Sequence, residues 1–122
     1  MKKILIPFLI IAFALCTVSC EDSGPDLNTA CVMARPYVKR MINFPEEAEF
    51  ENDKRGSGDI INGFTVYEQF TAPNAFGVKK RYVYKCHMKY LGGDQFLNSS
   101  WECSNLILED MQTGQQYRSY DY

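Results

Sequence analysis

The chain has 122 residues, which allows one domain, and 46% of them are hydrophobic, which is sufficient for a packed core. Its formal net charge is −2 at pH 7, which argues against a nucleic-acid-binding protein, because such proteins are usually basic overall. Low-complexity tracts are absent, so the composition also argues against a disordered chain.

The N-terminus has the parts of an export signal. A basic start at Lys2 and Lys3 precedes an almost unbroken apolar run over residues 4–18 and small residues before Cys20. This run is shorter than the roughly 20 residues that a transmembrane helix needs. Residues 17–20, Thr-Val-Ser-Cys, resemble a bacterial lipoprotein lipobox, with Thr17 in place of the usual Leu. The resemblance implies cleavage before Cys20 and acylation of its thiol.

The lipobox divides the chain into three parts. Residues 1–19 are the lipoprotein signal peptide, residues 20–26 are the lipidated cysteine and a polar tether, and residues 27–122 form a single domain. Cleavage takes two of the 13 basic residues and leaves 11 against 15 acidic ones, a net charge of −4. Acyl chains on Cys20 would hold the protein at a membrane. The alternatives are a cleaved signal peptide with an unacylated Cys20, or an uncleaved anchor helix.

An amphipathic pattern predicts a long helix over residues 26–43. Asp26 or Asn28 can cap its start. Pro36 lies inside this stretch, where proline removes a backbone hydrogen bond and clashes with the preceding turn. We expect one helix kinked at Pro36, because the apolar stripe keeps its phase there; in the alternative, the regular part starts near Arg35. The stripe recurs at spacings of three and four: Leu27, Cys31, Ala34, Val38, Met41 and Ile42.

The next segments indicate strands and turns. Alternation at Ala48 and Phe50 predicts a short first strand, and the charged, glycine-rich residues 52–58 are expected to form a turn. A second strand is predicted over residues 60–71 and a turn over residues 73–77. The packed face of the second strand is predicted to carry Phe64, Val66 and Phe70.

The clearest strand pattern lies between Lys79 and Tyr90. Its odd positions carry basic residues, interrupted only by Val83, and its even positions from Tyr82 onward carry apolar ones, so one face is expected to pack and the other to be exposed. The exposed side chains form what we call the basic stripe: Lys79, Arg81, Lys85, His87 and Lys89. The packed side chains are Tyr82, Tyr84, Cys86, Met88 and Tyr90.

A fourth strand is predicted over residues 100–109, with Trp101, Cys103 and Ile107 on its packed face. A hairpin centred between Asp94 and Gln95 sets its register. This register pairs Met88 with Trp101, Cys86 with Cys103, and His87 with Glu102. Residues 115–122 are expected to form a short last strand or a polar tail.

This order of elements predicts an α+β domain, with one N-terminal helix packed on a curved antiparallel meander of four to five strands. Such an arrangement resembles the cystatin-like and nuclear-transport-factor-like shapes. Two short strings, Val38-Lys39…Pro45…Ala48…Phe50 and Asn74…Phe76-Gly77…Tyr84…Cys86, are similar to strings in small uncharacterised exported bacterial proteins. Neither resemblance implies an activity, because fold does not give function.

The cysteines of the domain are Cys31, Cys86 and Cys103, all on predicted apolar faces. Export would bring them into an oxidising compartment, where three cysteines allow three pairings. We expect a Cys31–Cys86 disulfide, whose loop of about 55 residues could contribute about 4 kcal/mol in the chain-entropy model. Cys86–Cys103 is the alternative, because the hairpin register places these residues side by side.

The sequence gives little sign of catalysis. The chain contains one histidine, so no metal site is expected, and no motif indicates a cofactor. A thiol hydrolase needs Cys and His on one side, whereas His87 lies on the face opposite Cys86 and Cys103. His87 and Glu102 are a conceivable acid–base pair, but a solvated cross-strand pair is the simpler interpretation.

We therefore expect a non-catalytic binding or accessory module of the bacterial cell envelope. It would be lipid-anchored at Cys20 to the inner or outer membrane and would face the periplasm or the surface. The basic stripe is the expected partner surface for an envelope protein or an anionic ligand; in the alternative it is a solvated face near Glu68 and Glu102. A second functional class is an inhibitor-like or immunity-type protein that blocks an envelope enzyme through residues 52–58 and 73–77.

Overall fold

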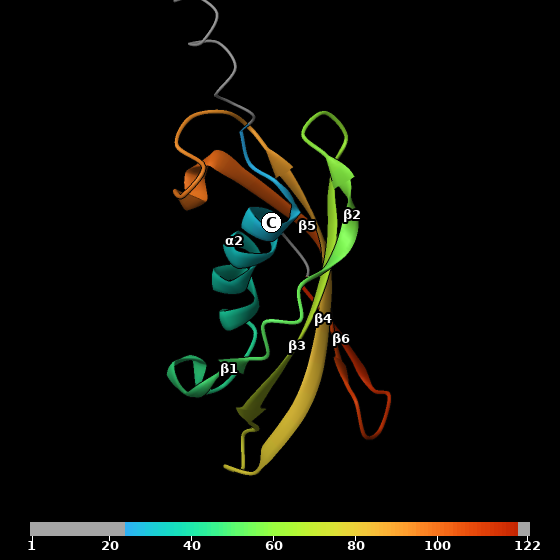
Figure 1. Ribbon diagram of the computed structural model, residues 1–122. Helices are drawn as coiled ribbons and strands as arrows, with labels where there is room; N and C mark the ends of the chain where they lie inside the picture. The colour runs from blue at the N-terminus through green and yellow to red at the C-terminus, as the bar shows by residue number, and fades with distance from the viewer. Residues whose placement is uncertain (1–23, 120–122) are drawn as a thin grey trace, which may run out of the picture.

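The computed structural model describes residues 24–119, in which one α-helix packs on one face of a six-stranded antiparallel sheet (Figure 1). The α+β class is as predicted, whereas the described sheet has one strand more than the upper prediction. The signal segment and Cys20 lie outside the described residues. The elements are α2 (Leu27–Lys39), the 3-10 turn η2 (Pro45–Glu47), β1 (Glu49–Phe50), β2 (Arg55–Asp59), β3 (Gly63–Pro73), β4 (Lys79–Tyr90), the 3-10 turn η3 (Asn98–Ser100), β5 (Trp101–Asp110) and β6 (Gln116–Arg118).

Helix α2 begins at a side-chain cap and ends earlier than predicted. The Asp26 carboxylate accepts a hydrogen bond from the Thr29 amide at 2.9 Å, and this bond holds the pKa of Asp26 below its ordinary value. Pro36 lies inside the helix, so the single-helix prediction is confirmed and a start near Arg35 is excluded. The last turn tightens because Met41 N–H bonds to the Val38 carbonyl three residues back.

The predicted turn at residues 52–58 was wrong, because Arg55–Asp59 is strand β2. Strands β1 and β2 pair one after the other with the same edge of β3, with Phe50 opposite Phe70 and Arg55 opposite Tyr67. All residues of β2 are exposed, so burial does not hold it. Backbone pairing with β3 holds β2 in place. Gly56 permits this pairing because it has no Cβ, and a Cβ there would lie 1.9 Å from the Thr65 carbonyl oxygen.

In the β4–β5 hairpin, the residues of β5 before its bulge lie on the predicted faces, and the residues after the bulge lie on the opposite faces. Met88 lies opposite Cys103 and Lys89 opposite Glu102, a shift of two residues from the predicted register. A bulge then follows at Asn105, whose φ is 53°, and it reverses the alternation of β5. Ile107 therefore faces outward, and the core receives Leu106 and Leu108 instead.

The core lies between α2 and the inner face of the sheet. The predicted helix stripe is buried at Cys31, Ala34 and Val38, with no exposed surface. The aromatic rings of β3 and β4 pack against one another, as for Phe70 and Tyr82, whose centroids lie 5.3 Å apart. The inner face is thus packed against α2, and no helix of residues 24–119 covers the outer face of the sheet (Figure 1).

The two ends of the sheet carry different turns (Figure 1). At one end, which we call the entry end, the described chain starts at Gly24 beside the β2–β3 turn (residues 60–62) and the β4–β5 connection (residues 91–100). At the opposite, distal end lie the β3–β4 turn (residues 74–78) and the β5–β6 turn (residues 111–115). No helix among residues 24–119 is long and apolar enough to cross a membrane.

Candidate functional site

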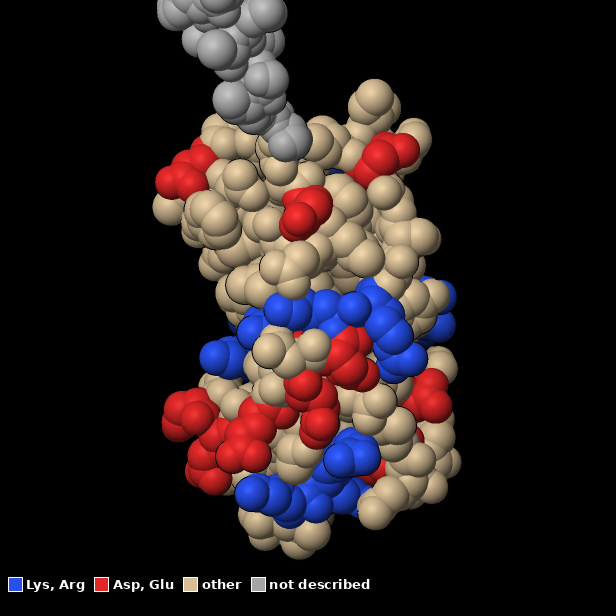
Figure 2. All heavy atoms as spheres, in the orientation of Figure 1, with Lys and Arg blue, Asp and Glu red and all other residues tan. Residues whose placement is uncertain are grey.

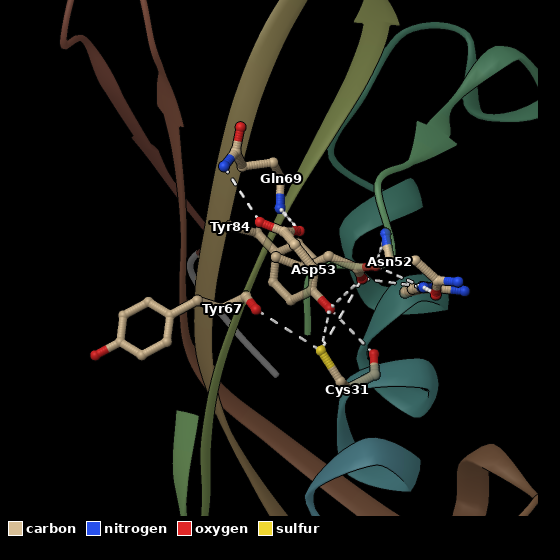
Figure 3. A network of polar contacts seen from close by, with 8 residues as sticks. Cys31, Asn52, Asp53, Tyr67, Gln69 and Tyr84 are labelled. Atoms are coloured by element: carbon tan, nitrogen blue, oxygen red, sulfur yellow. Dashed lines mark hydrogen bonds and ion pairs between the residues drawn. The ribbon is translucent and has the colours of Figure 1, made fainter. Parts of the chain in front are cut away.

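A charged cluster lies under the helix, in the middle of the otherwise apolar core (Figure 3). Glu68 of β3 has no exposed surface, and its carboxylate accepts two hydrogen bonds from Arg35 of α2, at 3.0 and 2.5 Å. The Asn52 amide and the Tyr84 hydroxyl each lie 3.0 Å from the same carboxylate. Every oxygen of this buried charge is therefore satisfied, as burial of an ion requires.

The prediction that Glu68 neutralises the basic stripe from outside was wrong. Glu68 shares its parity with Val66 and Phe70, which are both buried, so strand alternation turns its side chain toward the helix. The cluster also organises the break between β1 and β2. Asn52 has a φ of 68°, and the carboxylate of neighbouring Asp53 accepts the Gln69 amide at 3.0 Å in place of a strand partner.

The thiol of Cys31 belongs to the same cluster but is poorly suited to nucleophilic chemistry. Its sulfur lies 3.2 Å from the Tyr84 hydroxyl and has no exposed surface. Burial raises the pKa of Cys31, and burial likewise raises the pKa of Tyr84 well above its ordinary value. A thiol kept protonated and out of solvent is a structural hydrogen-bond partner rather than an attacking group.

The predicted Cys31–Cys86 disulfide is not formed in the structure, in which Cys31, Cys86 and Cys103 are buried free thiols. Cys31 turns toward Tyr84, whereas Cys86 shares a hydrogen bond with Cys103, and this bond together with burial raises the pKa of Cys86. The alternative pair is thus the one whose thiols lie side by side. His87 faces Ser104 and not Glu102, so the predicted pairing of His87 with Glu102 was wrong, which removes both the solvated cross-strand pair and the conceivable acid–base pair.

The basic stripe lies on the outer face of β4, and its members have different surroundings. Arg81 forms an ion pair with Glu51 at 3.6 Å, and Lys89 donates to the Ile61 carbonyl at 3.2 Å. Lys85 lies 5.5 Å from the centroid of the Tyr67 ring. Lys79 is exposed at the distal end of the strand. The stripe is therefore partly neutralised and is not a uniform positive surface.

A groove of about 490 Å³ opens beside the β5 bulge on this outer face. Across it, Lys85 of β4, Ile107 of β5 and Arg118 of β6 form one row of register partners. His87 occupies the next outward position of β4, and its ring lies over Gly63, where an added Cβ would meet Nε2 at 2.3 Å. No Asp or Glu lines the groove; its lining residues are Thr65, Lys85, Cys86, His87, Asn105, Ile107 and Arg118.

Arg118 and Asn105 were missed by sequence reasoning. All three residues of strand β6 are exposed, so the strand has no hydrophobic pattern. The bulge in β5 reverses the face of Ile107, and the sequence marks it only by a run of apolar residues at positions 106–108 in place of alternation.

A smaller apolar cavity of about 310 Å³ lies at the distal end, between the β3–β4 turn and the end of the helix. Phe76 and Tyr82 are among its lining residues.

Comparison with known proteins adds no relative: no family model, curated protein or solved structure matches the chain. Within residues 24–119, no group of three or more metal-ligating side chains gathers at one place. The groove and the buried cluster are thus the two polar arrangements on which a functional argument can rest.

Proposed function

We propose that this chain is a membrane-anchored lipoprotein of the bacterial cell envelope whose domain is a non-catalytic binding module. The lipobox-like residues before Cys20 support the anchor. We further propose that the domain has a cystatin-like or nuclear-transport-factor-like shape and presents the outer face of its sheet to an anionic ligand or partner. The helix-covered face is occupied by the core, so the uncovered face is the one available for binding.

One observation carries the binding proposal: the groove joins Lys85, His87 and Arg118 without any carboxylate in its lining. Lys85 and Arg118 hold permanent positive charge at neutral pH, and a carboxylate or phosphate between them would accept charge-assisted hydrogen bonds. The rest of the mature chain is acidic, so this local positive site stands out against its surroundings. A polar groove with a few convergent donors is a common form of ligand site.

The inhibitor-like alternative was expected to act through two loops, and only one of them projects from the domain. Residues 52–58 are bound along the edge of β3 and do not project, whereas Phe76 at the tip of the β3–β4 turn is 89% exposed. A protein that inserts this turn into an enzyme would lose binding on Phe76→Ala and keep it when the groove is altered. The two proposals therefore make opposite predictions for the two sites.

The test is a titration of the ¹⁵N-labelled, acylated mature protein in detergent micelles with inorganic phosphate and with citrate. We expect saturable chemical-shift changes at the backbone of the groove. Lys85→Gln combined with Arg118→Gln should weaken the affinity about tenfold or more, because hydrogen bonds to charged groups contribute about 1.5–3 kcal/mol each.

The control removes the same charge elsewhere on the stripe, by Lys79→Gln combined with Arg81→Gln. It should leave the titration nearly unchanged. Equal weakening by both pairs would show that general charge and not the groove attracts the anion, and the binding proposal would then be wrong.

A further inference from the structure

The entry end of the domain exposes large apolar side chains from both of its turns. Ile61 in the β2–β3 turn is 79% exposed. In the β4–β5 connection, Leu91 is 58%, Phe96 67% and Leu97 52% exposed. The β2–β3 turn is held to the end of β4, just before the β4–β5 connection begins, because the Lys89 ammonium donates to the Ile61 carbonyl at 3.2 Å. Exposed apolar residues gathered at one place indicate a contact surface.

The chain enters the domain at this same end. A Cβ added at Gly24 would lie 3.2 Å from Cδ1 of Ile60, so the first described residue is placed against the β2–β3 turn. Cys20 precedes Gly24 by four residues, which span at most about 14 Å when fully extended. An acylated Cys20 would therefore hold the entry end within that distance of the lipid surface.

The charges at the entry end are engaged in turns and caps. Asp26 caps the helix through Thr29, Asp59 accepts the Asn62 amide at 2.7 Å, and Asp94 accepts the Phe96 amide at 2.9 Å. Figure 2 shows this end, at the top of the view, with separate Asp and Glu side chains on otherwise largely uncharged surface, and with Lys and Arg gathered lower on the molecule. The acids that cap the helix and the turns have a local structural role, and the visible surface between the acids is largely uncharged.

The distal end does not combine exposed apolar residues with a scarcity of basic side chains. It also exposes apolar residues, with Phe76 at 89% and Val78 at 55%, but Lys79 and Lys80 follow at once on β4. The domain separates the two ends by the length of its longest strand, which has 12 residues, or about 40 Å. A tether of four residues therefore keeps the entry end, and not the distal end, close to the anchor.

We propose that the apolar entry end, formed by Ile61, Leu91, Phe96 and Leu97, docks on the lipid bilayer beside the anchor and holds the sheet upright on the membrane. This inference rests on the proposed lipid anchor. Docking would be driven by burial of apolar side chains in the interface and not by attraction to anionic lipid, since basic side chains are nearly absent from the visible surface there. It would leave the outer-face groove open to the side of the molecule.

The test places a tryptophan at each end of the domain in the acylated mature protein, as Phe96→Trp at the entry end and as the matched control Phe76→Trp at the distal end. Both replace an exposed phenylalanine, so neither should disturb the fold, which circular dichroism and the unfolding midpoint would check. The vesicles are phosphatidylcholine with or without bromine on the acyl chains. Trp101, which is 3% exposed, supplies the same background in both variants.

We expect the emission added by Phe96→Trp to be quenched by brominated lipid and that added by Phe76→Trp to be the same in both vesicles. Adding salt should not reverse the quenching. Protein that floats with the vesicles but shows no quenching at position 96 would keep the anchor and overturn the docking. Protein that does not float would overturn both. A blue shift at position 96 that follows protein concentration without lipid would place a second copy there, and it too would overturn the docking.

Discussion

Replacement of Arg35 by methionine tests the buried charged cluster most severely. The variant keeps an aliphatic side chain on the helix but leaves the Glu68 carboxylate, which has no exposed surface, without its cation. Removal of one partner from a buried ion pair costs about 3–5 kcal/mol. The Asn52 amide and the Tyr84 hydroxyl remain as donors, and the Arg35 side chain is 24% exposed, so we expect the lower part of that range.

A loss of about 3 kcal/mol is large against the 5–15 kcal/mol that stabilise a typical domain. The measurement is the free energy of unfolding in urea at pH 7, followed by the fluorescence of Trp101. The matched control is Arg55→Met, because Arg55 pairs with Asp53 at 3.2 Å while its side chain is 62% exposed. Exposed pairs of this kind contribute about 0–1 kcal/mol, so the control should lose little.

A second variant tests whether the loss comes from the unpaired Glu68 carboxylate. Combining Arg35→Met with Glu68→Leu should restore much of the loss, because it removes the uncompensated buried charge. Equal losses from Arg35→Met and Arg55→Met, or no restoration by Glu68→Leu, would refute this reasoning.

Three further predictions concern the strands and the cysteines. Gly56→Ala should destabilise the domain more than Gly77→Ala, because both glycines have positive φ but only Gly56 would bring its Cβ against a backbone carbonyl; unfolding in urea would measure the difference, and equal effects would contradict the pairing of β2. Asn105→Gly should be tolerated, whereas Asn105→Val should cost about 1–2 kcal/mol, because a β-branched residue disfavours the positive φ of the bulge. The three domain thiols should resist a thiol reagent in the native state and all react after unfolding without reductant; a single reactive thiol would show that two of them are joined.

Sequence patterns predicted the parts of the fold that bury apolar residues. The alternation between Lys79 and Tyr90 gave β4 with its bounds unchanged, because one face of that strand is packed and the other exposed. The helix stripe was correct at Cys31, Ala34 and Val38 for the same reason, whereas its last members, Met41 and Ile42, lie beyond the end of α2. Strand β2 was taken for a turn because Arg55–Asp59 buries no side chain and contains two glycines, so backbone pairing alone holds it.

The candidate sites were harder to predict because they depend on register and on charges inside the core. The parity that Glu68 shares with Val66 indicates the inner face, but the prediction placed Glu68 outside, because a lone carboxylate in the core needs a partner. That partner, Arg35, lies 33 residues away and no local pattern joins the two. The groove needs Arg118, which only the β5–β6 pairing brings to Lys85 across Ile107. Long-range pairing of this kind is fixed by the whole sheet and not by neighbours in the sequence.

Both the lipoprotein proposal and the docking proposal rest on acylation of Cys20, and intact mass of the protein purified from envelopes tests it most directly. The account predicts a chain that begins at Cys20 and carries the added mass of its acyl chains. A chain that begins at Glu21 without modification, or one that retains Met1, would contradict it.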